Sequence, residues 1–467
     1  MRLTSDYKSN LKLLGEALGV GYSFDIIERR IGVGENECAM FFIDGFAKDA
    51  ELQRVMQQLM GMKSLESFDK VYHSLTYVEV GKLSDVDAIV TAVLSGQTAL
   101  VGDVFGDVCI LIDARTYPSR GTAEPDSDRV MQGSRDGFVE TLIMNTALIR
   151  RRIRDPRLSV EHMTVGSSSK TDIALIFMRE VASPRLVSDI KKRLGEIKPK
   201  SLSLGYRSLA ESLIRDGWMN PFPKIRTTER PDTASAELLE GSVIIIVDTS
   251  PQAMILPTSI FDYLQQTDDY YFPPLTGTYL RIVRTVILIL SIFVTPLWYF
   301  ALENSAIIPE RFSFLIPDDP GVLPILVQLL LVEVAIDGLK IASMNTPDML
   351  SNSLSVIGAL ILGDFAVSVG WVCEDVILNM AFVALANFAQ QNAELGYAIK
   401  FVRVLTLLFV FGFGGWGLLL GLLLFIFLVA TNKSVYGRYH YLYPLIPFDW
   451  AAMKRLLFRV KKHDFEK

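Results

Sequence analysis

Hydrophobic positions divide the 467-residue chain into two unlike parts. Up to about Phe272 short apolar runs alternate with amphipathic stretches, and long apolar segments follow. The run CAMFFIDGFA at 38–47 ends in an Asp-Gly turn signal, which predicts a buried strand. By the same reasoning we expect strands at 107–113, 171–178, 242–248 and 252–257, and helices at 47–62, 88–100, 138–153 and 184–194. This alternation predicts a two-lobed α/β or α+β domain, with a first lobe at 1–118 and a second at 119–275.

The second part is predicted to be a helical membrane domain at 276–432. TVILILSIFVTPLWYFAL at 285–302 carries no charge and has about the length that crosses a hydrocarbon core of ~30 Å. Further apolar segments lie near 325–342, 355–372, 376–390 and 404–430. The last is longer than one crossing needs, and GFGGWG at 412–417 interrupts it. Either this segment forms a hairpin there, for about six crossings, or one short segment is re-entrant, for about four.

The placement of charges predicts that both termini are cytoplasmic. The N-terminus has no apolar signal core. The loop at 303–321 is mainly acidic, Arg281 and Arg284 precede the first apolar segment, and 433–467 forms a basic tail. Lys and Arg concentrate on the cytoplasmic side of membrane proteins. We therefore expect a cytoplasmic N-terminal domain followed by an α-helical multi-pass membrane domain.

Composition argues against several functional classes. The formal net charge is −6 and no basic stripe is interleaved with aromatic residues, so nucleic acid is not an expected partner. The three cysteines are scattered, which excludes a disulfide framework or a CxxC metal site, and the four histidines lack metal-ligand spacing. The sequence has no Walker loop and no GxSxG elbow. We expect no enzymatic activity, no cofactor and no metal.

One acidic residue lies deep in the expected membrane domain. Asp364 is near the middle of the apolar segment 355–372. The residues expected near it on the same helix face are Ile357, Ile361 and Ser368. An ionisable group at this depth costs several kcal/mol unless it faces water or a partner. Asp364 is either part of a ring of carboxylates that lines a cation pathway, or a hydrogen-bond partner of Asn379 or Asn387 in the next segment.

A second charged group lies at the end of the segment 325–342. Glu333, Asp337 and Lys340 are spaced so that all three share one helix face. They form either a charged vestibule for cations or a polar helix end, in which Lys340 extends to the interface and pairs with Asp337.

Small residues recur every three or four positions along the segment 355–372. This spacing predicts a stripe on which another helix packs closely, on a different face from Asp364. The packing residues are Ser355, Ala359, Gly363 and Ala366.

The soluble part contains one dense basic cluster. LIRRRIRDP at 148–156 places four arginines before the proline that ends the predicted helix. They are Arg150, Arg151, Arg152 and Arg154. The cluster is either a solvated helix end favoured by the helix dipole, or a site that binds acidic groups between lobes or between subunits.

The segment RGTAEPDSDRVMQGSRDGFVETLIMNTALIRRRIRDPRL at 120–158 resembles the signature of the GerA family of spore germination proteins, A-subunit type. Further matching motifs follow in order: TTERPD (227–232), LLEGSVIIIVDTSP (238–251), DDYYFPP (268–274), GALILGDFAV (358–367), ELGYAIKFVRVL (394–405) and YPLIP (443–447). The resemblance implies an assembly role for the signature residues Arg135, Glu140, Asn145, Arg150, Arg151 and Arg152. Departures at Ser134, Asp136 and Thr249 resemble the stage V sporulation branch of the family, whose members need not sense a nutrient themselves.

The resemblance implies a multi-pass protein of the spore inner membrane that forms a ring around an ion pathway. Its expected partners are membrane lipid, further copies of itself and other germination membrane subunits. We therefore expect a subunit of an oligomeric cation channel or release complex in spore germination. The alternatives are a secondary ion-coupled transporter, although no inverted repeat is visible, and a membrane-anchored scaffold for germination proteins.

Overall fold

The computed structural model describes residues 1–117, 133–197, 204–214, 219–345, 358, 365–390, 392–435 and 439–458. Contacts divide the chain into two compact units. The first unit contains Met1–Arg215 and Ile225–Thr258, and the second contains Asp216–Lys224 and Ser259–Lys467. The first unit thus ends at Thr258.

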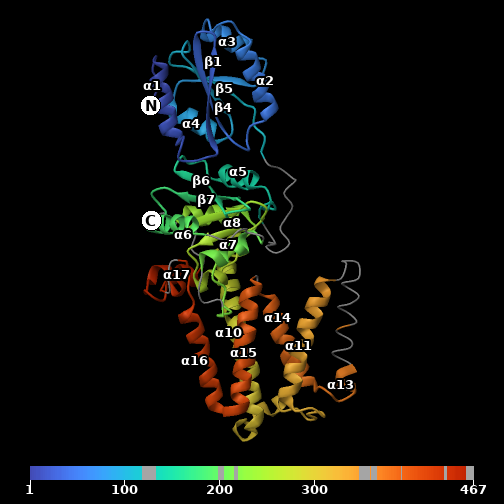
Figure 1. Cartoon of the computed structure of the whole chain (residues 1–467). Coiled ribbons are helices and arrows are strands. Elements are labelled where there is room, and N and C mark those ends of the chain that lie inside the picture. The colour runs from blue at the N-terminus through green and yellow to red at the C-terminus, as the bar shows by residue number, and fades with distance from the viewer. Residues whose placement is uncertain are drawn as a thin grey trace. The chain divides into compact units, whose positions relative to one another are not determined.

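The first lobe is a five-stranded sheet with helices on both faces (Figure 1). Its elements are α1 (Tyr7–Leu18), β1 (Ile26–Val33), β2 (Asn36–Ile43), α2 (Asp49–Met60), α3 (Phe68–Ser74), β3 (Val80–Leu83), α4 (Val86–Leu94), β4 (Thr98–Gly102) and β5 (Cys109–Ile112), and the strand order is β1-β2-β4-β5-β3. Successive side chains of β2 point to opposite faces of the sheet and pack in two different hydrophobic cores. Ala39 and Phe41 pack in the core that includes α1 and α4, and Cys38 and Met40 pack in the core that includes α2 and α3. Because both faces are buried, β2 is a continuous apolar run.

The second lobe repeats this plan with another five-stranded sheet. Its elements are α5 (Leu142–Arg152), β6 (Leu158–Val165), β7 (Thr171–Met178), α6 (Pro184–Gly195), α7 (Tyr206–Leu213), β8 (Arg226–Thr228), α8 (Pro231–Leu239), β9 (Val243–Val247) and β10 (Ala253–Leu256), and the strand order is β6-β7-β9-β10-β8. Ala174 and Ile176 of β7 pack in the core that includes α5 and α8. Phe177 points to the other face, where Lys191 of α6 lies over its ring.

The pairs of neighbouring strands in both sheets are antiparallel. Each sheet begins with a hairpin, β1–β2 or β6–β7, and a short connection of this kind requires antiparallel pairing. The lobes therefore have the α+β arrangement, which is one of the two that the alternation of strands and helices allowed.

The second unit is helical. Its α-helices are α9 (Asp268–Tyr271), α10 (Pro274–Glu303), α11 (Ile325–Met344), α13 (Ala366–Ser368), α14 (Glu374–Phe388), α15 (Ala393–Phe413), α16 (Gly415–Thr431) and α17 (Trp450–Leu457). Among the residues that the structure describes, α10 and α15 are long and apolar enough to cross a membrane, and α16 is apolar but shorter. Large apolar side chains are exposed on several helices of this unit, such as Leu378 on α14, Phe411 on α15 and Phe427 on α16.

The long apolar stretch near 404–430 is divided at Gly414. This residue has φ of +58°, a left-handed conformation that favours glycine, and it separates α15 from α16. The two helices pack side by side (Figure 1). The structure thus has the helical hairpin that was one of the two sequence-based alternatives, and α15 begins at Ala393, before the apolar stretch expected there.

Two glycines allow the close approach of α15 and α16. A Cβ on Gly417 would collide with the backbone of Phe409 and Val410, and one on Gly421 would collide with the side chain of Thr406. Their spacing is that of the small-residue motif on which membrane helices pack. The hairpin therefore depends on these two positions.

We expect Gly417→Ala to destabilise this hairpin, because the added methyl group meets backbone atoms that cannot rotate away. Overpacking of this kind costs about 1–3 kcal/mol. The thermal unfolding midpoint of the purified full chain in detergent measures the effect. Gly412→Ala is the matched control, since nothing lies within 4 Å of a Cβ there. Equal midpoints for the two variants would contradict the prediction.

Candidate functional site

A buried charge network joins the helices α10, α11 and α15. On α11, Glu333 accepts a hydrogen bond from Arg403 of α15, with 2.7 Å between Oε1 and Nη2. Lys400 of α15 pairs with Asp337 of α11 and lies 3.3 Å from Glu333. Arg403 also donates to the carbonyl oxygen of Ser291 on α10, at 3.2 Å. Two carboxylates are thus balanced by two cations.

The burial of this network decreases along α11. The side chain of Arg403 is 1% exposed and that of Glu333 is 10% exposed, whereas that of Asp337 is 33% exposed. The pairs 333 with 403 and 337 with 400 show that α11 and α15 run antiparallel. Arg403, Glu333 and Lys400 are therefore held away from solvent, while Asp337 lies nearer the surface of this unit.

Lys400 and Arg403 were not predicted as site residues. Both lie in ELGYAIKFVRVL, where two cations within an apolar run were the available signal. One of the two interpretations of this helix end paired Asp337 with Lys340, but the structure pairs Asp337 with Lys400. Lys340 instead lies over the ring of Tyr397, 5.0 Å from its centroid.

The third apolar segment is described at its C-terminal end. Asp364, Ile357, Ile361, Ser355, Ala359 and Gly363 lie outside the described residues. Ala366 is half-buried in α13, and the hydroxyl of Ser368 donates to the carbonyl oxygen of Phe365. Gly370 has φ of +76° and follows the end of this helix. Gly370 therefore belongs to a turn.

Asn379 was one possible partner for Asp364, and the structure gives it another contact. Its Oδ1 accepts a hydrogen bond from the hydroxyl of Thr295 on α10, at 2.6 Å. This bond connects α14 to the middle of α10, beside the turn that contains Ser291.

In the first unit, Arg150 joins the two lobes. Its guanidinium is fully buried and binds Asp25 through Nε at 2.8 Å and Nη2 at 3.1 Å. Nη2 also donates to the hydroxyl of Ser23 and to the carbonyl oxygen of Leu158. Backbone bonds continue this contact, since the Phe24 amide donates to the carbonyl oxygen of Val160 at 2.9 Å. Arg150 therefore has partners in both lobes.

The other signature residues have separate contacts. Arg152 binds the carboxylate of Asp136 at 2.6 Å, and the guanidinium of Arg151 lies 4.6 Å from the ring centroid of Tyr117. The buried side chain of Asn145 bonds to the amide and the carbonyl oxygen of Val139. Arg135 and Glu140 are exposed. The basic cluster is thus not one anion site, and its arginines connect different segments.

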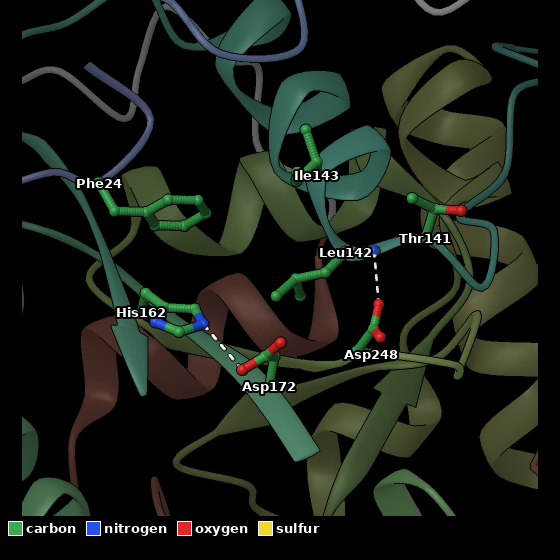
Figure 2. Close-up of a pocket in the computed structure, with 7 residues that line it drawn as sticks. All are labelled: Phe24, Thr141, Leu142, Ile143, His162, Asp172 and Asp248. Atoms are coloured by element: carbon green, nitrogen blue, oxygen red, sulfur yellow. Dashed lines mark hydrogen bonds and ion pairs between the residues drawn. The ribbon is translucent and has the colours of Figure 1, made fainter. Parts of the chain in front are cut away.

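A pocket of about 430 Å³ opens near the contact between the lobes. Its lining residues are Phe24, Thr141, Leu142, Ile143, His162, Asp172 and Asp248 (Figure 2). His162 Nε2 lies 3.0 Å from the carboxylate of Asp172, and Asp248 accepts a hydrogen bond from the Leu142 amide at 3.1 Å. The sequence did not predict this pocket, because its residues come from both lobes.

Comparison with known proteins identifies the family. The family model described as Bacillus/Clostridium GerA spore germination protein matches residues 12–467. Stage V sporulation protein AF of Bacillus subtilis (strain 168) is 34% identical over 467 residues, covering 99% of this chain and 94% of that protein. Spore germination protein KA of Bacillus subtilis (strain 168) is 29% identical, covering 94% and 82%.

A solved structure is also similar. The crystal structure of the N-terminal domain of the A subunit of the Bacillus megaterium spore germinant receptor GerK3 is 26% identical, covers 55% of this chain and 96% of that chain, and gives a TM-score of 0.42. The family resemblance inferred from the motifs is confirmed by the family model and the relatives. This chain belongs to the GerA family of spore germination proteins.

Proposed function

We propose that this chain is a membrane subunit of an oligomeric complex that conducts cations across the spore inner membrane during germination. The observation that carries the proposal is the buried network of Glu333, Asp337, Lys400 and Arg403 within apolar helices. Ionisable groups at membrane depth are costly and occur mainly at ion pathways and relays. The GerA membership supports the germination role.

The network suggests how such a pathway is controlled. In the described arrangement Arg403 and Lys400 neutralise both carboxylates, so no net negative charge attracts a cation. A separation of α11 from α15 would release Glu333 and Asp337 from their partners. Unpaired carboxylates that face a hydrated path attract cations and repel anions. We infer that the paired arrangement is the non-conducting one, and that copies of this chain and other germination subunits surround the path.

The proposed topology places the lobes and both termini in the cytoplasm. We expect an impermeant thiol reagent, applied from outside, to label Asp318→Cys in the 303–321 loop but not Val78→Cys in the first lobe. Burial raises the pKa of the native Cys38 and Cys109 thiols to about 12, so these groups stay protonated and unreactive. The reverse labelling pattern would show that the orientation is wrong.

Asp364 is proposed to line the same path. Asp364→Asn removes the charge and nearly preserves the shape of the side chain. We expect conductance or the preference for cations over anions to fall, with little loss of assembled protein, and Asp364→Leu to reduce flux further by drying the constriction. If Asp364→Asn leaves flux unchanged but lowers the amount of complex, the residue is a structural hydrogen-bond partner.

Electrical recording from the purified protein in a planar bilayer separates the candidate functions. Unitary currents would support the channel, and saturable coupled flux would support a secondary transporter. The absence of both, with and without other germination subunits, would favour a membrane-anchored scaffold.

A further inference from the structure

The segment 443–458 carries an exposed apolar surface that the charge network does not use. Six large apolar side chains are exposed in the turn before α17 and along α17: Leu445, Ile446, Phe448, Trp450, Leu457 and Phe458. We call this set the α17 patch. Phe448 and Trp450 are 64% and 63% exposed, and their ring centroids lie 6.2 Å apart. Two residues of the YPLIP motif, Leu445 and Ile446, belong to the patch.

Arg281 sets the depth of α17 relative to the expected bilayer. Its Nη1 donates hydrogen bonds to the carbonyl oxygens of Arg455 at 2.9 Å and Leu456 at 3.3 Å. Arg281 precedes Thr285, where the uncharged run of α10 begins, by about 6 Å of helix. The headgroup layer starts at the edge of the hydrocarbon core and is several Å deep. The end of α17 therefore lies at headgroup depth when α10 crosses the membrane.

Protein contacts and exposed apolar groups occupy different faces of α17. Ala452, Met453 and Leu456 are half-buried against the rest of the unit. Trp450 and Leu457 are seven residues apart and share an exposed stripe, and exposed Lys454 lies one turn from Trp450. A tryptophan in an apolar stripe with lysine at its edge is typical of a helix that lies in the membrane interface.

We propose that the α17 patch inserts into the cytoplasmic headgroup layer and that Lys454 binds the phosphate of an anionic lipid. The inference rests on the proposed membrane location of the second unit. The exposed apolar area of the α17 patch favours insertion at the boundary between headgroups and acyl chains. The positive charge of Lys454 favours a membrane surface that contains anionic lipid. The short helix would then hold the cytoplasmic end of α10 at a constant depth through Arg281.

Spin labels on the full chain in vesicles test the insertion. Trp450→Cys and Leu457→Cys are labelled in a background where Cys38, Cys109 and Cys373 are replaced by alanine. Oxygen concentrates in lipid, and a nickel chelate stays in water. We expect both labels to be relaxed by oxygen and protected from nickel. Accessibility to nickel would overturn the proposal, and protection from both reagents would replace it with a protein contact.

Two control positions separate this inference from the proposed function. The control labels are placed at Phe427→Cys and Val78→Cys. Phe427 is exposed on α16, and Val78 is 95% exposed in the first lobe. The first should contact lipid and the second should contact water. If the label at 427 is in water, the membrane assignment itself fails. If it is in lipid while those at 450 and 457 are in water, only the α17 inference fails.

The lipid preference is tested by charge. In phosphatidylcholine vesicles that contain phosphatidylglycerol, Lys454→Glu should move the label at 450 out of the lipid and toward water. The ratio of membrane-inserted to water-exposed label should fall about fivefold for each unit of charge that is changed. In pure phosphatidylcholine the shift should be absent. Lys82→Glu, an exposed site on β3, is the control with the same charge change. Equal shifts in both vesicle types would refute anionic-lipid binding.

Discussion

Arg403→Met is expected to destabilise the helical unit by about 3–5 kcal/mol, the usual cost of leaving one member of a buried ion pair without its partner. The variant removes the hydrogen bonds to Glu333 and to the Ser291 carbonyl oxygen. Glu333 would then keep Lys400 at 3.3 Å as its remaining cation. We therefore expect a destabilisation near the lower end of this range, about 3 kcal/mol. The thermal unfolding midpoint and the yield of monodisperse full-length protein measure the effect.

The double variant Glu333→Gln with Arg403→Met separates pairing from packing. Removing both charges should restore much of the stability, because a neutral pair needs no buried counter-ion. Lys340→Met is the control on α11, since that cation contacts a ring and is worth about 0.5–1 kcal/mol. Under the proposed function the double variant also changes ion flux. A double variant as unstable as Arg403→Met would show that packing dominates.

Arg150→Met is expected to loosen the two lobes from each other, again at a cost of about 3–5 kcal/mol. The substitution leaves the carboxylate of Asp25 buried, at 2% exposure, without its cation. Hydrogen exchange in the full chain should accelerate at Phe24, whose amide bonds to Val160 across the lobes. Exchange in the interior of β4 should change less, because that strand lies within the first sheet.

Two further variants test this interpretation. Asp25→Asn combined with Arg150→Met should recover part of the protection, because no unpaired charge remains. Arg154→Met is the matched control, since it makes the same change at an exposed position of the same basic cluster. If Arg154→Met accelerates exchange at Phe24 as much as Arg150→Met does, the Asp25 contact is not what joins the lobes.

Local patterns in the sequence were sufficient for several of the strands that are buried on both faces, but not for β4, whose first residues fall in the expected helix 88–100. β2, β7 and β9 were predicted because a sheet covered on both sides needs an uninterrupted apolar run. β1 was missed, since it is an edge strand in which Arg29 and Arg30 are exposed. The break at 412–417 was visible as glycines, but the choice of a hairpin needed the packing of α15 on α16.

The family, the lobes and the apolar segments followed from the sequence by itself, because motifs and periodicity are properties of neighbouring residues. The ion-pair partners of the buried arginines did not follow from the sequence. Arg150 is 125 residues from Asp25, and Arg403 is 70 residues from Glu333. Whether an arginine at such a position is solvated or buried against a carboxylate depends on which distant helix packs on it. Tertiary structure alone decided that, because burial and pairing are set by contacts between segments that no local pattern relates.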